Sequence, residues 1–233
     1  MNEPLAGRVV LVVGASSGIG HATATLLVSR GMHVHAIARR APDVAGTTAR
    51  AVDVTDRAAV DAAVASIERI DALVYCAGTN VPKRRLGELT PAAWDELVAA
   101  NLTGAFNLVH ASFAKLQAAR GDIVIVSSVS ARWPDASGPA YQAAKGGLSS
   151  FAHAVALEVR AQGIRVCAIE PGMVDTPMMK NRPQPPDAAT RAQMLRPEDV
   201  AESIAFVLAL PKRAAIPELV ILPAALQSLG KTS

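Results

Sequence analysis

Cysteine, aromatic side chains and long apolar runs are all scarce in this sequence of 233 residues. Its two cysteines, Cys76 and Cys167, each lie in an apolar run typical of a buried strand. This favours free thiols in a reducing compartment over a disulfide, so we expect a cytoplasmic protein. The first residues lack a basic start followed by an apolar stretch, and no later segment keeps about 18 apolar residues without a charge or turn residue. We therefore expect neither secretion nor membrane insertion.

A strong charge of one sign is lacking too. The formal net charge is +3, and the Lys and Arg residues are scattered, whereas nucleic-acid binding requires a basic stripe. His33 and His35 share one face of a predicted strand, but no third ligand is near them, so we expect no metal site. Hydrophobic residues make up 51% of the chain, which favours a large apolar core. We expect residues 1–233 to form one domain.

Short β-branched runs alternate along the chain with longer Ala-rich stretches of helical period, which is typical of repeated βαβ units. The runs are apolar throughout, as in strands covered by helices on both faces. Strands are predicted at 8–13, 33–38, 49–54, 72–76, 122–127, 165–169 and 219–222. Helices are predicted at 19–30, 57–68, 91–101, 102–119, 140–162 and 197–210, with no helix at 39–48. The fold class is therefore α/β, a doubly wound parallel sheet of about seven strands.

Glycines follow the first predicted strand in the pattern Gly14-Ala-Ser-Ser-Gly18-Ile-Gly20, and a helix is predicted directly afterwards. A Cβ at these positions would obstruct a tight strand-to-helix turn and the close approach of backbone to a pyrophosphate. The N–H groups at the start of the helix are suited to phosphate charge. The loop therefore predicts a dinucleotide site, although a tight turn without a ligand also uses glycine.

The second predicted strand ends at Arg39 and Arg40, where NAD-binding chains place an acidic residue for the ribose 2′-hydroxyl. Two arginines favour a 2′-phosphate and hence NADP(H) over NAD(H); the alternative is that both are ordinary solvated residues. Asp53 and Val54 end the third predicted strand. There the Asp can hold the adenine edge of the cofactor or cap the following helix.

Tyr141 and Lys145 are four residues apart in a predicted helix, which places them on one helical face. A free phenol has a pKa of about 10, and a neighbouring ammonium stabilises the phenolate, so we expect Lys145 to lower the pKa of Tyr141. Ser128 follows a buried strand at the sheet edge where open α/β folds bind ligands. By itself the Tyr/Lys spacing is common, and on most helices it is a packing residue beside a solvated charge.

Taken together, these motifs identify the chain as similar to the short-chain dehydrogenase/reductase family over almost its whole length. The glycine loop, Ala77-Gly78, Pro171-Gly172 and Thr176 match in order, and Asn101, Ser128, Tyr141 and Lys145 stand at the catalytic positions. The resemblance implies cofactor contacts from Gly14, Ser16, Ser17, Gly18, Ile19, Gly20, Arg39, Arg40, Asp53, Val54, Ala77, Gly78, Tyr141, Lys145, Pro171, Gly172, Val174 and Thr176.

The implied activity is an NADP(H)-dependent interconversion of a carbonyl and an alcohol. Tyr141 is the expected acid/base and Ser128 the expected hydrogen-bond donor to the substrate oxygen. Lys145 is expected to bind the nicotinamide ribose and Asn101 to hold a relay water. Thr176 and the backbone after Pro171-Gly172 are expected to orient the carboxamide. The helices at 102–119 and 140–162 carry more apolar surface than a monomer normally exposes, and the resemblance implies that they form the interface of a homodimer or homotetramer.

Several residues depart from the family pattern. Val13 replaces a Thr, and Tyr75-Cys76 replaces two asparagines, so hydrogen bonds that support the central sheet are lost or remade. These changes leave a second hypothesis open, a non-catalytic dinucleotide-binding regulator or scaffold. The short proline-rich stretch after Thr176 predicts a more open pocket. Residues 83–85, Lys-Arg-Arg, are expected to be a solvated charge run rather than a grip for an acidic substrate.

Overall fold

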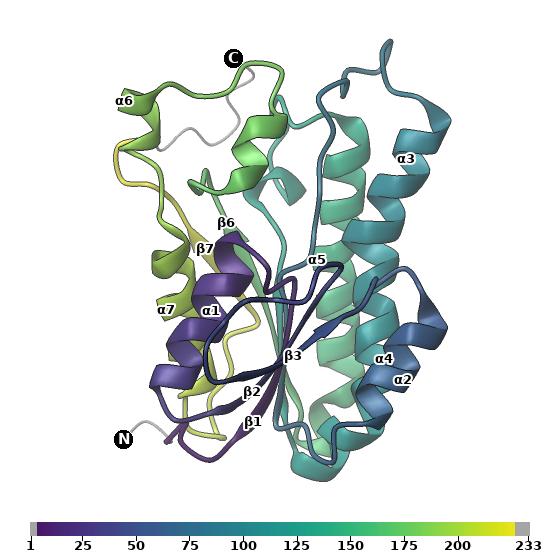
Figure 1. Cartoon of the computed structure of the whole chain (residues 1–233), viewed down its shortest axis with the longest axis vertical. Helices are drawn as coiled ribbons and strands as arrows, with labels where there is room; N and C mark the ends of the chain where they lie inside the picture. The colour runs from purple at the N-terminus through teal and green to yellow at the C-terminus, as the bar shows by residue number, and fades with distance from the viewer. Residues whose placement is uncertain (1–3, 227–233) are drawn as a thin grey trace.

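The computed structural model describes residues 4–226 and contains one seven-stranded parallel sheet of order β3-β2-β1-β4-β5-β6-β7 (Figure 1). The strands are β1 (Val9–Val13), β2 (His33–Ala38), β3 (Thr47–Ala51), β4 (Ala72–Tyr75), β5 (Asp122–Val126), β6 (Arg165–Pro171) and β7 (Glu218–Ile221). The strand order reverses between β1 and β4, so the predicted doubly wound sheet is confirmed. The prediction of one domain extends to residues 1–3 and 227–233, which lie outside the described residues.

Two helical layers cover the sheet. The helices are α1 (Gly18–Ser29), α2 (Arg57–Ala65), α3 (Pro91–Val98), α4 (Gly104–Ala119), α5 (Pro139–Val159), α6 (Ala188–Arg191) and α7 (Pro197–Leu208). On one face α1 and α7 pack together, and on the other lie α2, α4 and α5, with α3 beside α5 (Figure 1). Leu27 and Ile204 belong to the first apolar layer, and Leu108 and Leu148 belong to the second. Burial on both faces explains why the strands are continuously apolar.

A π-helical turn, η1 (Ala99–Thr103), joins α3 to α4. The predicted helix boundary between residues 101 and 102 is therefore wrong, because the backbone continues through a widened turn and keeps its helical course. The resulting helix, Pro91–Ala119, is long and apolar enough by length and composition to span a membrane, and 44% of its most apolar window is buried. In this structure it packs on β4, β5 and α5, as a core helix does.

Strand β3 is placed differently from its prediction at residues 49–54. It begins at Thr47 and ends at Ala51, because the chain turns at Asp53, whose carboxylate accepts a hydrogen bond from the N–H of Thr55. Strand β7 begins one residue earlier than predicted, and β6 extends to Pro171. The expected absence of a helix between β2 and β3 is confirmed. Three elements too short to show a period were missed: α6, η2 (Val129–Ala131) and η4 (Pro177–Asn181), whereas η3 (Arg160–Gln162) falls within the helix predicted at 140–162.

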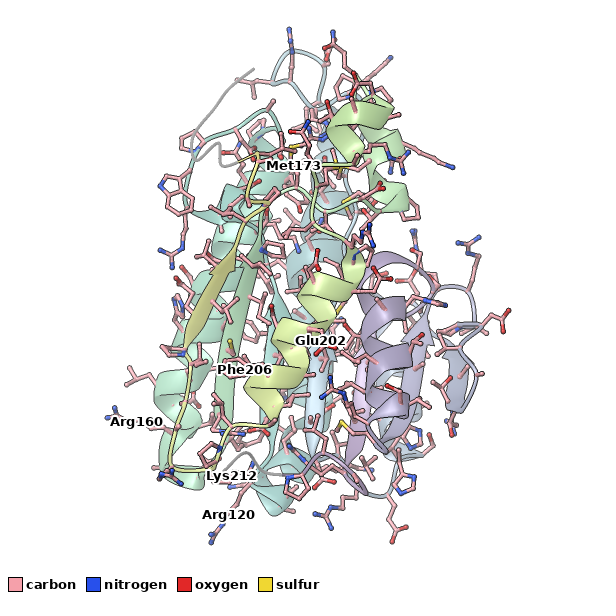
Figure 2. The ribbon with its side chains drawn as sticks, turned by 90° about the vertical axis from the view of Figure 1, so that its left-hand side faces the viewer. Arg120, Arg160, Met173, Glu202, Phe206 and Lys212 are labelled. Carbon is pink, nitrogen blue, oxygen red and sulfur yellow. The ribbon has the colours of Figure 1, made fainter. Side chains whose placement is uncertain are left out.

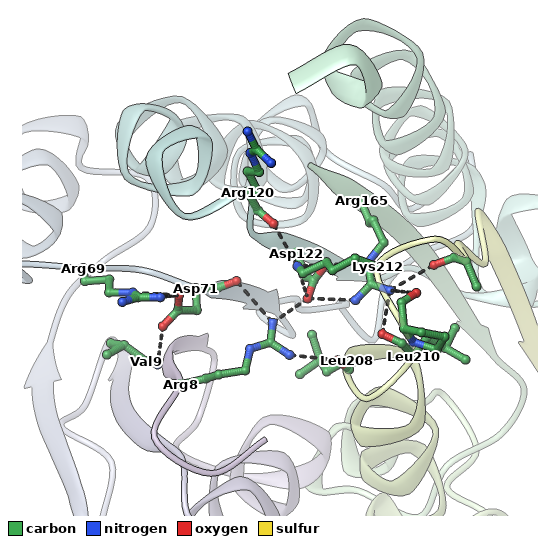
Figure 3. A network of polar contacts seen from close by, with 12 residues as sticks. Arg8, Val9, Arg69, Asp71, Arg120, Asp122, Arg165, Leu208, Leu210 and Lys212 are labelled. Carbon is green, nitrogen blue, oxygen red and sulfur yellow. Dashed lines mark hydrogen bonds and ion pairs between the residues drawn. The ribbon is translucent and has the colours of Figure 1, made fainter. Parts of the chain in front are cut away.

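Asp122 gathers basic groups at the amino-terminal edge of the sheet (Figure 3). Its carboxylate, 3% exposed, accepts from Arg8, from Arg165 Nε at 2.7 Å and from Lys212 at 3.3 Å. Nearby, Asp71 accepts from the N–H of Val9 at 2.8 Å. These contacts hold together the starts of β1, β4, β5 and β6. Figure 2 shows Lys212 and Arg120 at this edge and Met173 at the opposite one.

Candidate active site

A cavity of about 470 Å³ opens at the carboxyl-terminal edge of the sheet. Most of the predicted site residues line it: Gly14, Ser16, Ser17, Gly18, Ile19, Arg39, Arg40, Asp53, Val54, Ala77, Gly78, Ser128, Tyr141, Lys145, Pro171, Gly172, Val174 and Thr176. Two predicted residues, Gly20 and Asn101, are not part of its wall. The fold thus brings the expected nucleotide-binding and catalytic residues to one place, as expected at a topological switch point.

The glycine loop is built around close backbone contacts. Gly14 has φ +83°, and a Cβ there would lie 2.7 Å from the backbone nitrogen of Ala77. A Cβ on Gly20 would lie 2.3 Å from the carbonyl oxygen of Gly14, so Gly20 permits the turn without touching the cavity. Ser17 begins α1 but its hydroxyl caps none of the N–H groups of the first turn. Those N–H groups and the missing Cβ atoms form a cradle that fits a dinucleotide pyrophosphate.

The adenosine end of the cavity carries positive charge. Arg39 and Arg40 are exposed at the end of β2 and line the cavity. Asp53 Oδ1 accepts from the backbone N–H of Thr55 at 2.9 Å, and this bond holds the pKa of Asp53 below its usual value. The alternative that Asp53 caps the next helix is wrong, because Asp56 is the N-cap of α2. Contact between Asp53 and adenine stays a prediction.

Tyr141 and Lys145 lie on the same face of α5, with the Lys145 ammonium 5.8 Å from the centre of the Tyr141 ring. Lys145 Nζ donates a hydrogen bond to the carbonyl oxygen of Val126 at 3.0 Å, which fixes it against the end of β5. Ser128 follows the same strand and begins η2. The four-residue spacing of Tyr141 and Lys145 therefore correctly predicted that they share one helix face. The end of β5 brings the Ser128 hydroxyl to the same place.

Burial raises the pKa of Tyr141 to about 12, although hydrogen bonding with Ser128 acts in the opposite direction. Burial also lowers the pKa of Lys145 to about 8. The expectation that Lys145 lowers the phenol pKa is therefore wrong for this structure. The cause is that removal from water dominates at both groups, while the ammonium binds the Val126 carbonyl.

Asn101 is buried within the π-helical turn. Its Nδ2 donates to the carbonyl oxygens of Leu97 at 2.9 Å and Thr79 at 3.0 Å, and its Oδ1 accepts from Thr79 N–H at 3.1 Å. A Cβ on Gly78 would lie 2.7 Å from Asn101 Oδ1 and 3.5 Å from Lys145 Nζ. Asn101 and Lys145 thus flank Gly78, with Asn101 behind the cavity wall. Its role in holding a water stays a prediction.

Tyr75 and Cys76 show how this chain remakes contacts at the end of β4. The Tyr75 side chain is fully buried, and its hydroxyl donates to the carbonyl oxygen of Ala100 at 2.7 Å, in the π-helical turn. Cys76 lines the cavity and Cys167 is buried in β6, and both are free thiols, as predicted. Val13 is buried at the end of β1. The sheet therefore keeps a side-chain link to the α3–α4 helix through Tyr75.

Arg84 corrects the expectation of a solvated charge run at residues 83–85. Lys83 and Arg85 are exposed, but Arg84 is only 5% exposed. Its Nε donates to the carbonyl oxygen of Val81 at 2.8 Å, and its Nη2 donates to that of Asn181. Burial lowers the pKa of Arg84. The sequence predicted a solvated run because Arg84 stands between two other charged residues. The segment that covers Arg84, at Asn181, lies 97 residues later in the chain.

A polar chain leads away from Ser128. Ser128 Oγ donates to Ser130 Oγ at 3.1 Å, and Ser130 Oγ donates to Asp135 Oδ2 at 2.6 Å. The other carboxylate oxygen of Asp135 accepts from the N–H of Ser137 at 2.8 Å. The charge on Asp135 acts with burial to raise the pKa of Tyr141. Nothing in the sequence motifs pointed to Asp135.

Sequence reasoning missed part of the cavity wall: Ala38, Val52, Thr55, Cys76, Thr79, Glu96, Ala99, Ala100, Val126, Ser127, Pro177, Met178 and Met179. Most of these adjoin predicted site residues, so extending each motif by one residue would have found them. Glu96 and Ala99 come from the α3–η1 helix and carry no such signal.

Trp133, which follows Ser128 by five residues, does not line the cavity; its ring lies 5.9 Å from the Arg132 guanidinium. Within residues 4–226, no group of three or more His, Cys, Asp or Glu side chains is arranged to hold a metal ion. The His33 and His35 pair therefore lacks a third ligand in the described part of the chain.

Comparison with known proteins identifies the family. The family model described as short chain dehydrogenase matches residues 8–187. The chain belongs to the short-chain dehydrogenase/reductase family, whose members bind a nicotinamide dinucleotide and act as oxidoreductases on small molecules.

Three relatives illustrate the match. Cis-4-hydroxycyclohexanecarboxylate dehydrogenase of Sinomonas cyclohexanicum is 40% identical over 227 residues, covering 89% of this chain and 91% of the relative. The closed form of serine dehydrogenase complexed with NADP⁺ has a TM-score of 0.87 at 25% identity, covering 97% and 99%. A 3-ketoacyl-(acyl-carrier-protein) reductase from Brucella melitensis complexed with NADH has a TM-score of 0.85 at 25% identity, covering 94% and 98%.

Proposed function

We propose that this protein is an NADP(H)-dependent dehydrogenase/reductase that interconverts a secondary alcohol and a carbonyl, with Tyr141 as the acid/base. The observation that carries the proposal is the meeting of Tyr141, Lys145 and Ser128 in the same cavity as the glycine loop. One wall is suited to hold a dinucleotide and the other to hold and protonate a substrate oxygen. This is the arrangement that a hydride transfer coupled to a proton transfer requires.

A bound nicotinamide dinucleotide would supply the hydride in reduction and accept it in oxidation. In reduction, Tyr141 donates its phenolic proton to the substrate carbonyl oxygen, and Ser128 stabilises that oxygen with a hydrogen bond. In oxidation, the phenolate of Tyr141 takes the proton of the alcohol. The chain Ser128–Ser130–Asp135 fixes the position of the Ser128 oxygen, and its single proton turns from Ser130 Oγ to the substrate oxygen when the substrate binds.

Lys145 and Asn101 support the proton transfer. The Lys145 pKa of about 8 lets this group lose and regain a proton near neutral pH, so it can pass a proton between Tyr141 and solvent. We propose that Asn101, across Gly78 from the ammonium, positions the water for this relay. Thr176 and the backbone at Pro171-Gly172 would hold the nicotinamide carboxamide.

The cofactor preference for NADP(H) rests on Arg39 and Arg40. Guanidinium groups bind phosphate through paired hydrogen bonds, and both side chains lie at the cavity beside β2. The similar solved structures are found with both cofactors, NADP⁺ in serine dehydrogenase and NADH in the ketoacyl reductase, so the choice of NADP(H) rests on the two arginines. Replacing both arginines with Ala should shift the NADPH-to-NADH ratio of kcat/KM at least about tenfold toward NADH. An unchanged ratio overturns the assignment of the 2′-phosphate site.

The activity is tested by following NADPH absorbance with a panel of ketones and aldehydes, and NADP⁺ reduction with alcohols. The panel includes cis-4-hydroxycyclohexanecarboxylate and serine, the compounds named for two relatives. Turnover that disappears in Tyr141→Phe supports the proposal. Nucleotide binding with no turnover across the whole panel would favour the alternative, a non-catalytic dinucleotide-binding protein.

We also propose a homodimer or homotetramer formed through α4 and α5. Phe106 and Phe151 touch edge to face on these helices with ring centres 6.3 Å apart, and Phe106 is 41% and Leu157 65% exposed. An apolar surface of this kind is typical of subunit contacts. Light scattering should give two or four times the chain mass, and Leu157→Glu should lower it. The free thiols of Cys76 and Cys167 support the further proposal of a cytoplasmic location.

A further inference from the structure

Three loops meet at the end of the cavity that holds Tyr141. Asn80, after β4, donates from Nδ2 to the carbonyl oxygen of Ser137 at 3.1 Å, just before α5. Asn181, at the end of η4, donates from Nδ2 to the carbonyl oxygen of Asn80 at 3.2 Å. Arg84 binds the carbonyl oxygen of Asn181, and a Cβ on Gly138 would lie 2.5 Å from the Arg84 carbonyl oxygen. The buried arginine is therefore fixed beside the start of the helix that carries Tyr141.

Arg84 is a buried charge without an acidic partner. Its Nε and Nη2 donate to backbone carbonyls, and its Nη1 has no hydrogen-bond partner among residues 4–226. Neither Arg84 nor Arg182 forms an ion pair within those residues. Burial and the like charge of Arg182 both lower the pKa of Arg84. Unpaired buried charge is costly, so an anion bound here offsets that cost.

Neither arginine is part of the cavity wall, but each lies next to an element that forms it: Arg84 is beside Gly138 at the start of the Tyr141 helix, and Arg182 directly follows η4. The positive charges of Arg182 and Arg84 each act to lower the pKa of Tyr141, against the larger effect of burial. Met178 and Met179 belong to η4, which ends one residue before Arg182, and both line the cavity. Asp135 is the acidic group close to Arg84, but its two oxygens already accept from Ser130 and Ser137. At this end, the cavity wall thus supplies an apolar surface and a proton donor, and two cations that no carboxylate pairs within residues 4–226 lie in the elements beside it.

We propose that Arg182 and Arg84 bind a carboxylate of the substrate, so that the protein acts on hydroxy acids and the corresponding oxo acids. The inference rests on the proposed function and adds its substrate class. Arg182 supplies the direct contact, while Arg84 fixes the η4 segment through Asn181 and contributes its free Nη1. The apolar part of the substrate lies against Met178 and Met179, and the reacting carbon–oxygen group lies at Tyr141.

The test measures ligand binding and needs no turnover. Calorimetry on the NADPH-bound protein compares cyclohexanecarboxylate with cyclohexanecarboxamide, which has the same shape without the charge. We expect the carboxylate to bind about tenfold more tightly, because charge-assisted hydrogen bonds are the stronger ones. Arg182→Gln should bring the two affinities to within about twofold. The control Arg160→Gln removes the same charge at the opposite end of the molecule, as Figure 2 shows, and should leave the preference unchanged.

Arg84 is tested with two variants, because it also anchors η4. Arg84→Lys keeps the charge and should retain a partial preference for the carboxylate, whereas Arg84→Gln should lose it. Equal affinity for acid and amide in the wild type, or a preference that survives Arg182→Gln, overturns the inference. A parallel turnover assay compares cis-4-hydroxycyclohexanecarboxylate with its carboxamide. Selective carboxylate binding without turnover of either compound would overturn the proposed function and keep the anion site.

Discussion

The two edges of the sheet use the same kinds of side chain in opposite ways. At the amino-terminal edge, Arg8, Arg165 and Lys212 all bind the single buried carboxylate of Asp122 (Figure 3). At the carboxyl-terminal edge, Arg84 and Lys145 are also buried, yet within residues 4–226 they donate to backbone carbonyls and have no ion pair. Paired charges fix the strands, and charges left unpaired by the fold keep their capacity to bind a ligand.

The largest effect is expected at the carboxyl-terminal edge. Tyr141→Phe should lower kcat at least about a thousandfold, because the phenol oxygen is the proposed proton donor. Dinucleotide affinity and thermal unfolding should stay near wild type, since within residues 4–226 the partner of the Tyr141 hydroxyl is the Ser128 side chain and no backbone group. Stopped-flow or steady-state kinetics and fluorescence titration of NADPH measure the two quantities. Residual activity above a tenth of wild type contradicts the assigned role.

At the opposite edge, a change should affect stability alone. Asp122→Ala should lower the free energy of unfolding by about 3 kcal/mol at neutral pH, because it leaves buried cations without their partner. Turnover per folded molecule should not change. Urea unfolding measures the loss, and Asp61→Ala on the exposed face of α2 is the control.

The loss of stability in Asp122→Ala should depend on pH. Burial acts to raise the pKa of Asp122, but the hydrogen bond from Arg165 and the charges of Lys212, Arg165 and Arg8 outweigh it and lower the pKa. Because the pKa of Asp122 is lower in the folded state, the ionised carboxylate stabilises the fold above the unfolded-state pKa of about 3.9. This stabilisation is lost as the pH falls through the folded-state pKa. The stability difference between wild type and Asp122→Ala should therefore shrink below about pH 4. A constant difference down to pH 2 contradicts this account.

Asp135 is an acidic group at the carboxyl-terminal edge, near Tyr141. Asp135→Asn keeps an acceptor for Ser130 but removes the charge that acts with burial to raise the pKa of Tyr141. Alcohol oxidation requires the phenolate, so its rise with pH should begin at lower pH in this variant. The pH profile of kcat/KM measures the shift, with Asp61→Asn as control. A profile that shifts to higher pH, or stays in place, excludes the electrostatic role.

The smallest effect is expected from the other tyrosine. Tyr75→Phe removes the hydrogen bond to the Ala100 carbonyl and should cost about 1 kcal/mol of unfolding free energy. Its turnover should match wild type, the reverse of Tyr141→Phe. The identical chemical change at two buried phenols thus separates support from catalysis. A loss of turnover larger than the loss of folded protein would place Tyr75 in the chemistry as well.

Much of this arrangement was predictable from the residues. The glycine loop, the apolar strands and the spacing of Tyr141 and Lys145 depend on local geometry, and the structure places them as predicted. Contacts between distant segments were not predictable. Arg84 is buried only because the segment at Asn181 folds over it, and the phenol pKa is raised because burial outweighs a neighbouring charge. The π-helical turn at Ala99–Thr103 was missed because a widened turn leaves no mark in the apolar period.

The contact between Tyr75 and the π-helical turn restricts how this chain can change. A Cβ on Gly104 would lie 2.7 Å from the Tyr75 hydroxyl and 2.6 Å from a methyl carbon of Val54, so the glycine and the large phenol depend on each other. A shorter side chain at position 75 removes one of these two obstacles, and Val54 must then yield as well. The three positions are therefore coupled, so that the effect of a substitution at one depends on the residues at the other two.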